Sequence, residues 1–259
     1  MWRLRRGILF VAAAVLAACG GGADAERALS DGRVARSVSP ESPRTAMITT
    51  TTSTVTTTSS VAPATPTTLT TTPGFSGEIS AADEELLGSS WRSGCPVAVA
   101  DLRLITVVHH GIDGSPETGE MVVHVDHAEA LLTVFETLFD AGFPIERMEL
   151  ITAYAGDDNA SMRANNSSAF NCRLIDGTNR WSQHAYGTAV DINPLVNPWV
   201  RGSTVDPPEG AAHLDREAET PGLIRADDVV VQAFEAIGWS WGGYWTGSVD
   251  YQHFSANGR

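Results

Sequence analysis

The amino-acid sequence predicts an α+β fold, in which a single compact domain with a small antiparallel sheet and flanking helices follows a disordered tether. Two observations favour this class. First, short strand-like runs mix irregularly with two main amphipathic helices, whereas a parallel βαβ array would alternate them regularly. Second, residues 20–74 are polar and lack an apolar period, so they cannot bury enough apolar surface to fold. We therefore expect the domain to occupy residues 75–259.

Turn residues and apolar periods predict the individual elements. Residues 126–139 repeat apolar side chains at helical spacing. Asp126 and Glu129 are spaced as an N-cap and its capping-box partner, and Gly142 and Pro144 follow as a stop signal. The expected strands are 102–109, 121–125, 148–154, 187–192 and 249–254, and the expected helices are 81–89, 126–139 and 228–237.

The first 18 residues predict a signal peptide. Three arginines precede an apolar run over residues 8–18 that is too short to span a membrane. The run ends in Leu-Ala-Ala followed by Cys19, which resembles the signal of a bacterial lipoprotein. The resemblance implies cleavage before Cys19 and lipid attachment to its sulfur, so we expect an extracytoplasmic protein, lipid-anchored to the bacterial cell membrane. An ordinary secretory signal with a chance cysteine is the alternative.

Residues 19–74 predict a lipid-anchored, threonine-rich linker. Most positions from Thr49 to Thr72 are threonine, with prolines among and just after them. Such a segment would lift a domain off a membrane surface. O-glycosylation and a plain, unmodified linker are both compatible with this composition.

The charge of the chain argues against one class of partner. The formal net charge is −14, and every basic residue is an arginine. Because so acidic a chain repels polyanions, we expect no nucleic-acid partner.

The cysteines predict one disulfide. If Cys19 is lipidated, only Cys95 and Cys172 are left. An exported compartment permits disulfides, and two leftover cysteines favour a bridge between them. Two buried free thiols are the alternative. A metal-ligand role for Cys172 is weakly supported, because histidines and an aspartate elsewhere already make a complete ligand set.

Two segments carry the chemistry: Ser-Gln-His-Ala-Tyr-Gly-Thr-Ala-Val-Asp, which ends at Asp191, and Asp-Tyr-Gln-His, which ends at His253. A catalytic zinc site needs three N or O ligands, an open position for water and a nearby general base. His184, Asp191 and His253 can supply the three ligands, and Asp250 can act as the base. We therefore expect one zinc ion per domain.

The sequence around the candidate ligands and base places two requirements on the structure of the site. Val190 and Ile192 flank Asp191, so its carboxylate is expected on a buried strand, where it needs a counter-charge such as a metal. A polar turn with a histidine that only hydrogen-bonds is the alternative. On one strand, Asp250 and His253 would face opposite sides, so a bend or bulge is required if both reach the metal.

The pattern Ser-x-His-x-x-Gly-x-Ala-x-Asp, followed later by Asp-x-x-His-Phe, is similar to the zinc D-alanyl-D-alanine carboxypeptidase family. This family comprises VanY-like and VanX-like peptidases and is related to L-alanyl-D-glutamate endolysin peptidases. Segments 165–173, 191–198 and 239–243 look like one branch of it, and the resemblance covers roughly residues 88–259. It implies a hedgehog/DD-peptidase-like fold. It also implies the family roles of zinc ligand for His184, Asp191 and His253, and of general base for Asp250.

The resemblance extends to the substrate. In this family an arginine upstream of the first histidine binds the substrate carboxylate, and Arg173 is the matching position, with Arg163 as the competitor. Ser182 is expected either to hydrogen-bond substrate or to cap a turn. The last motif reads His-Phe-Ser, where many relatives carry an acid after the phenylalanine, so one contact around the metal ligands departs from the family pattern.

The resemblance thus implies a hydrolase of the cell envelope, a zinc metallopeptidase that acts on peptidoglycan stem peptides. An arginine fork for a terminal carboxylate favours a D-alanyl-D-alanine carboxypeptidase. The alternatives are an L-alanyl-D-glutamate type endopeptidase and a non-catalytic, zinc-stabilised module that binds cell-wall peptides. We expect a monomer that touches the membrane only through its N-terminal lipid.

Other histidines and aromatic residues fit less specific roles. A structural or surface position is expected for His109, His110, His124 and His127. His213 is expected in a loop, with no role assigned. The aromatic side chains within 239–245 either wall a substrate groove or close the core.

Overall fold

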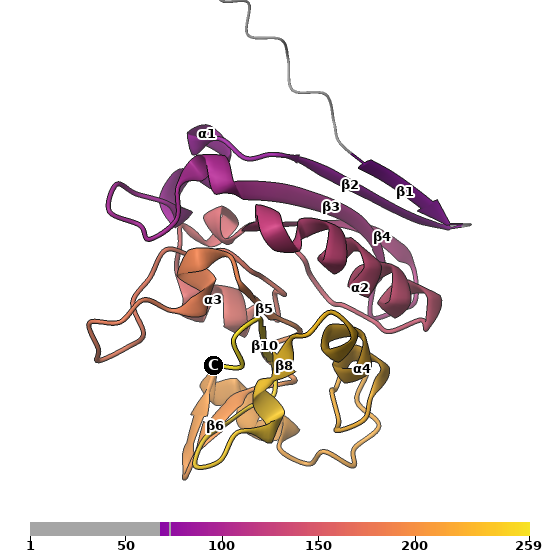
Figure 1. Cartoon of the computed structure of the whole chain (residues 1–259). Helices are drawn as coiled ribbons and strands as arrows, with labels where there is room; N and C mark the ends of the chain where they lie inside the picture. Colours follow the sequence, from indigo (N-terminus) through magenta and orange to yellow (C-terminus); the bar gives the residue numbers. More distant parts are fainter. Residues whose placement is uncertain (1–67, 73) are drawn as a thin grey trace, which may run out of the picture. The chain divides into compact units, whose positions relative to one another are not determined.

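The computed structural model describes residues 68–72 and 74–259, all within the second of the chain's two compact units, Ser60–Arg259. This unit is α+β, with small antiparallel sheets and few helices, as the sequence predicts (Figure 1). The strands are β1 (Thr68–Thr72), β2 (Phe75–Ala81), β3 (Leu102–His110), β4 (Pro116–His124), β5 (Ala189–Asp191), β6 (Trp199–Arg201), β7 (Thr204–Asp206), β8 (Ser240–Trp241), β9 (Val249–Asp250) and β10 (His253–Ser255). The α-helices are α1 (Glu84–Leu87), α2 (Ala128–Asp140), α3 (Asp158–Arg163) and α4 (Val229–Ala236). The 3-10 helices are η1 (Gly88–Ser90), η2 (Val99–Asp101), η3 (Val125–His127), η4 (Ile151–Tyr154), η5 (Gln183–Tyr186), η6 (Pro208–His213) and η7 (Gly242–Tyr244).

The largest sheet has the order β1-β2-β3-β4, and every pair in it is antiparallel. Helix α2 lies along one face of this sheet (Figure 1). Ile105 and Val107 of β3 are fully buried and share a core cluster with Leu131 and Phe135 of α2. The apolar side chains that predicted these two elements therefore form the interface between them.

This sheet begins earlier than expected. Strand β1 lies inside the segment 19–74 that the sequence assigns to the linker, and it pairs with β2 from Thr68↔Ile79 to Thr72↔Phe75. Residues 68–72 of that segment are therefore part of the described sheet. Threonine is a good strand former because its branched side chain suits a pleated surface, so the composition that favours a linker also permits an edge strand.

The start of α2 corrects a second expectation. Asp126 does not cap the helix, because residues 125–127 form η3 and the Asp126 N–H donates to His124 Nδ1. The helix begins at Ala128 without a side-chain cap, so the predicted capping box is wrong. Its end is as expected, because Gly142 adopts a φ of 68° just beyond the last turn.

A strand was expected over residues 148–154, but none forms there, so this prediction is wrong. Residues 151–154 are η4, and the two backbone groups of Glu149 bond to one side chain. Its N–H donates to Asn166 Oδ1 at 2.7 Å, and its carbonyl oxygen accepts from Asn166 Nδ2 at 3.0 Å. A buried asparagine thus makes the bonds that a neighbouring strand would make, and an apolar period does not reveal such a substitution.

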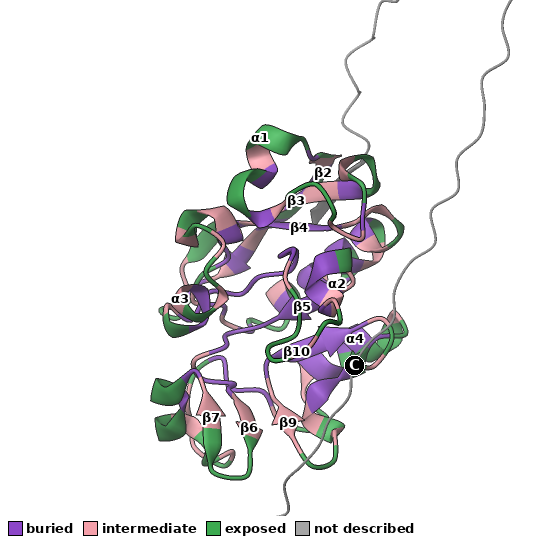
Figure 2. Cartoon of the chain, turned by 90° about the vertical axis from the view of Figure 1, so that its left-hand side faces the viewer, coloured by how far each residue is buried: buried purple, intermediate pink, exposed green. Residues whose placement is uncertain are grey.

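Two further sheets carry the C-terminal half, in the orders β5-β10-β8 and β7-β6-β9. The expected strand 249–254 is split between them, because β9 and β10 are separated by residues 251 and 252 and belong to different sheets. The predicted bend between Asp250 and His253 is thereby confirmed. Figure 2 shows that β5 lies in the buried interior, whereas β6, β7 and β9 form a more exposed margin.

Helix α4 packs against the β5-β10-β8 sheet. The Asp228 carboxylate caps its first turn, as the expected start at residue 228 requires. Phe234 of α4 stacks on Phe254 of β10, with ring centroids 4.1 Å apart. Because Phe254 follows His253 directly, this contact fixes the strand that presents the histidine.

The expected signal peptide, Cys19 and the linker up to residue 67 lie outside the described residues. Across the part of the chain that the structure describes, we find no helix with the length and apolar character that a bilayer crossing requires.

Candidate metal centre and catalytic site

Three buried side chains converge from three separate elements. His184 comes from η5, Asp191 ends β5, and His253 begins β10. Asp191 and His253 are direct partners across the antiparallel β5–β10 pair. One ligand atom from each of the three residues lies within 4.8 Å of the other two. The structure therefore brings together the three residues that the sequence proposes as metal ligands.

The turn between the first two of these residues depends on Gly187. This glycine has a φ of 69°, and a Cβ built on it would lie 2.7 Å from the backbone nitrogen of His124. Only glycine satisfies both conditions. The turn begins at Ser182, whose Oγ accepts the N–H of His184 at 3.3 Å. Ser182 therefore caps this turn, and its role in substrate binding stays a prediction.

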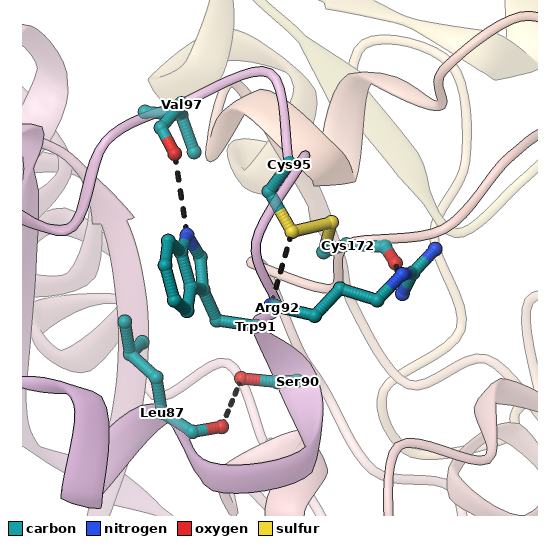
Figure 3. Close-up of a disulfide and its surroundings, with 7 residues drawn as sticks. All are labelled: Leu87, Ser90, Trp91, Arg92, Cys95, Val97 and Cys172. Carbon is teal, nitrogen blue, oxygen red and sulfur yellow. Dashed lines mark hydrogen bonds between the residues drawn. A yellow bond between two sulfur atoms is a disulfide. The ribbon is translucent and has the colours of Figure 1, made fainter.

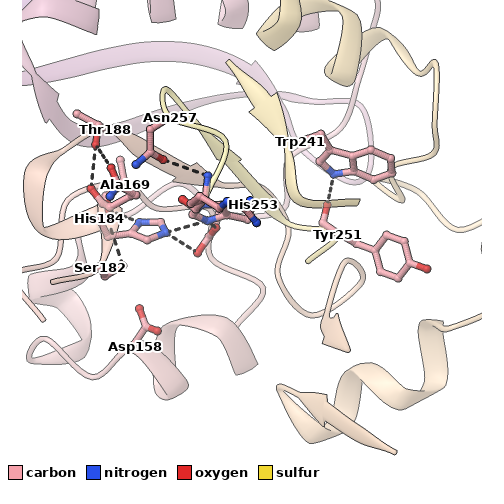
Figure 4. Close-up of polar contacts among 12 residues, drawn as sticks. Asp158, Ala169, Ser182, His184, Thr188, Trp241, Tyr251, His253 and Asn257 are labelled. Carbon is pink, nitrogen blue, oxygen red and sulfur yellow. Dashed lines mark hydrogen bonds and ion pairs between the residues drawn. The ribbon is translucent and has the colours of Figure 1, made fainter. Parts of the chain in front are cut away.

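The side chains of His184 and His253 point toward each other (Figure 4). His184 Nε2 lies 3.1 Å from Asp191 Oδ2, and His253 Nδ1 lies 3.0 Å from Asp191 Oδ1. The two ring nitrogens, His184 Nε2 and His253 Nδ1, are 3.3 Å apart. Three potential ligand atoms thus surround one small volume in the protein interior.

Backbone carbonyls hold both rings in orientation. His184 Nδ1 donates to Ala169 O at 2.6 Å, and His253 Nε2 donates to Arg259 O at 3.2 Å. These bonds fix the tautomers, so that in neutral rings His184 Nε2 and His253 Nδ1 both present a lone pair inward. Two lone pairs 3.3 Å apart repel each other unless a proton or a cation lies between them. The donor set, two imidazoles and a carboxylate, suits zinc.

The pKa values of Asp191 and His253 also favour a cation at this position. Burial opposes the ionisation of Asp191, but the neighbouring imidazoles of His184 and His253 outweigh it and hold the pKa of Asp191 far below its usual range. Burial would also lower the pKa of His253, yet the hydrogen bond to Asp191 and the nearby carboxylates raise it. The site thus favours positive charge next to an ionised Asp191, which is the condition for cation binding.

Asp250 stands beside this cluster with one oxygen unpaired. Its Oδ1 is buried and has no hydrogen-bond partner among the described residues. Burial raises the pKa of Asp250 to about 7, against the opposing effect of His253. Gly242 makes room for it, because a Cβ there would lie 2.9 Å from the Cβ of Asp250. A carboxylate whose pKa lies near neutrality is suited to accept and return a proton.

The two candidate substrate arginines differ in their surroundings. Arg173 Nη2 pairs with Asp158 Oδ2 at 2.8 Å, and Arg173 Nε is buried without a partner. Asn171 connects this pair to the metal side chains, because its N–H donates to His184 O while its side chain contacts Asp158 Oδ1 at 3.5 Å. Arg163, at the end of α3, is exposed. Arg173 is thus closely tied to the site through the backbone.

The disulfide Cys95–Cys172 is present, with Cα atoms 5.9 Å apart (Figure 3). The free-thiol alternative is therefore wrong. Arg92 Nη1 donates to Cys172 O at 2.5 Å, and the Cys172 N–H donates to Ser90 O at 2.9 Å. Since Arg173 follows Cys172, these contacts hold its backbone against the N-terminal part of the unit.

The aromatic cluster divides between the two expected roles. Trp239 and Trp241 are buried in the core, and Trp241 Nε1 donates to Tyr251 O at 2.8 Å. Trp245 packs against His253, with ring centroids 5.3 Å apart. The cluster therefore mainly closes the core, while Trp245 covers part of one candidate metal ligand.

The remaining histidines lie in structural or surface positions, although His213, which was expected in a loop, belongs to a 3-10 helix. His109 is buried within β3, and burial lowers its pKa. His110 stacks on Phe139 with ring centroids 4.4 Å apart, and His127 packs edge-on against Trp239. His213 ends η6, and its carbonyl accepts from Arg216. None of them belongs to the group of potential metal ligands found among the described residues.

Sequence reasoning missed a framework of buried asparagines behind the site. Asn193 donates to Pro144 O and Gly222 O, while its Oδ1 accepts the N–H of Glu146. The side chains of Asn165, Asn166, Asn193 and Asn197 are almost wholly buried and bond mainly to loop backbone. Several asparagines within a short apolar stretch are the available signal, because buried amides must find partners.

A family model described as D-alanyl-D-alanine carboxypeptidase matches residues 176–256. The comparisons found no matching curated protein and no matching solved structure. The matched segment contains His184, Asp191, Asp250 and His253, whereas Arg173 lies just outside it. The resemblance to the VanY-like D-alanyl-D-alanine carboxypeptidase family is thereby confirmed over the segment that carries the metal site.

Proposed function

We propose that the protein is a zinc carboxypeptidase that removes the terminal D-alanine from peptidoglycan stem peptides. The family match supports a zinc peptidase that acts on peptidoglycan. The observation that carries the proposal is the convergence of His184, Asp191 and His253 beside Asp250, a buried carboxyl whose pKa is raised to about 7. A purely structural metal site needs no such acid.

In this proposal the chain's own residues divide the work. His184 Nε2, the Asp191 carboxylate and His253 Nδ1 would hold the zinc ion, and Ala169 O and Arg259 O keep the two rings turned inward. When bound, zinc supplies a water of lowered pKa and polarises the scissile carbonyl. Asp250 accepts the proton of the attacking water and returns it to the leaving amine.

Arg173 bears on the choice between a carboxypeptidase and an endopeptidase. Its guanidinium is paired with Asp158 on one side, and the side chain is 30% exposed, so an additional acceptor can approach its exposed N–H groups. A terminal carboxylate is the acceptor that fits a guanidinium fork. This supports a carboxypeptidase over an endopeptidase, whose substrate has no carboxylate end at that position.

Two other functions differ in what they require. An L-alanyl-D-glutamate endopeptidase would use the same metal and base, so only the substrate distinguishes it. A zinc-stabilised binding module would have no need of Asp250, and the unpartnered buried oxygen of this residue therefore speaks against it.

We further propose that the protein is a monomer attached to the outer face of the cell membrane through lipid on Cys19. The lipoprotein-like signal and the threonine-rich stretch support this placement. Replacement Cys19→Ser should release the protein from membrane fractions, and unchanged partitioning would contradict the anchor.

The function is tested by incubating the zinc-loaded protein with defined muropeptides and reading the products by mass spectrometry. Release of the terminal D-alanine from a pentapeptide stem supports the proposal. Cleavage only between L-alanine and D-glutamate would establish the endopeptidase. Binding without cleavage, in a protein that retains zinc, would establish the binding module.

A further inference from the structure

A groove with a volume of about 520 Å³ lies against the turn that carries His184. Its lining consists of six side chains: Asn179, Arg180, Trp181, Gln183, Tyr186 and Thr188. Gln183 and Tyr186 are the two ends of η5, so they flank His184 in the chain. The metal site and the groove therefore share a single turn, with the His184 ring on its buried side.

The groove is already formed in the unbound protein. One wall is a hairpin in which Leu174 and Trp181 are bridge partners and the Ile175 N–H donates to Arg180 O at 2.9 Å. The guanidinium of Arg92 lies over the Trp181 ring at 5.8 Å. On the other wall, Thr188 Oγ1 donates to Gln183 Oε1 at 3.0 Å. Because the side chains of Trp181, Gln183 and Thr188 are held in place, a ligand would not have to order these three.

The lining has a definite chemical character. It offers two aromatic rings, two amides, two hydroxyls and one guanidinium, and it contains no carboxylate. Tyr186 has 36% of its surface exposed and is one of the two aromatic residues of the lining. Such a lining fits a ligand with apolar faces, many hydrogen-bonding groups and a neutral or negative charge.

We propose that this groove binds an N-acetylated sugar of the peptidoglycan glycan strand, so that the enzyme prefers stem peptides that are still attached to glycan. A pyranose ring has apolar C–H faces that stack on Trp181 and Tyr186, and hydroxyl and acetamido groups that bond to the amides. Arg180 can donate hydrogen bonds to the carbonyl oxygen of the amide that joins the sugar to the peptide. The inference rests on the proposed function, because it names the substrate form of the same site.

The test compares two substrates on the full-length, zinc-loaded protein. One is a free pentapeptide, and the other is the same pentapeptide linked to an N-acetylglucosaminyl-N-acetylmuramic acid disaccharide. We expect kcat/KM to be about tenfold higher for the linked form, a typical effect of one well-packed aromatic contact. Tyr186→Ala should abolish this preference without changing hydrolysis of the free peptide. Tyr244→Ala, which removes a 50% exposed tyrosine outside the groove, is the matched control.

A binding measurement separates this inference from the proposed function. If neither substrate is cleaved, the proposed function fails, and calorimetry with the disaccharide pentapeptide still decides about the groove. Binding that Tyr186→Ala weakens about tenfold, and Tyr244→Ala does not, supports the sugar site. Equal kcat/KM for both substrates, or disaccharide binding that is insensitive to Tyr186→Ala, overturns it even if the peptidase activity is intact.

Discussion

The Nε2 atom of His184 lies 3.3 Å from the Nδ1 atom of His253, and the other nitrogen of each ring donates to a backbone carbonyl. This relationship identifies the point at which a cation stabilises the site. Without a proton or a cation between them, two inward lone pairs would face each other beside an ionised carboxylate, and with a cation they become ligands.

Removal of one ligand should therefore abolish zinc binding. For His184→Ala we expect zinc affinity to fall at least about 100-fold, because the change removes a direct ligand and not merely a residue that orients one. Metal analysis after dialysis should find about one zinc ion per wild-type chain and almost none in the variant. His213→Ala, which changes a histidine outside the cluster, should retain full zinc content.

The raised pKa of Asp250 predicts a pH-dependent effect on the stability of the metal-free protein. A buried acid with a folded pKa of about 7 contributes stability when protonated, and this contribution is lost as the pH rises through that value. Asp250→Asn removes the ionisation, so the variant should be more stable than wild type at pH 8, by on the order of 2–4 kcal/mol. At pH 4 the two should differ little.

Thermal unfolding of both metal-free proteins between pH 4 and pH 8 measures this difference. A difference in melting temperature that does not change with pH would show that Asp250 ionises normally in the folded state.

The disulfide should contribute to stability more than to metal binding. Cys95 and Cys172 are separated by 77 residues, and opening a loop of that length costs ~4 kcal/mol in the chain-entropy account. Denaturant unfolding of the Cys95→Ser/Cys172→Ser double variant should show a loss of this size, with zinc content unchanged. A loss below ~1 kcal/mol would mean that the bridge adds little to the contacts of Arg92 and Ser90.

Arg173 and Arg163 can be distinguished by substrate charge. If Arg173 holds the terminal carboxylate, Arg173→Ala should lower kcat/KM about 10- to 100-fold for a pentapeptide with a free carboxylate. It should have little effect on the slower reaction of the corresponding C-terminal amide. Arg163→Ala is the matched control, and the reverse pattern would assign the carboxylate to Arg163.

The sequence predicts the residues of the candidate site more accurately than it predicts some of the nearby secondary structure. His184, Asp191, Asp250 and His253 are identifiable because metal chemistry restricts both residue type and spacing. The bend between Asp250 and His253 is predictable for a related reason, since a regular strand would separate the two side chains.

Other parts are set by contacts that no local pattern encodes. Residues 148–154 have a strand-like composition, but the Asn166 side chain takes up the backbone groups of Glu149 and no ladder forms. The capping box at Asp126 fails because His124 accepts the N–H of that residue and the first turn tightens into η3. In both cases a long-range or competing side-chain bond overrides the local preference.

In the proposed mechanism, zinc held by His184, Asp191 and His253 performs hydrolysis with Asp250 as the base. Measurement of zinc content and D-alanine release on the same preparations of wild type and Asp250→Asn tests this division of roles. We predict one zinc ion in both proteins and a turnover that is about 10²- to 10⁴-fold lower in the variant. A zinc-loaded Asp250→Asn protein that hydrolyses the pentapeptide at nearly the wild-type rate would contradict the claim.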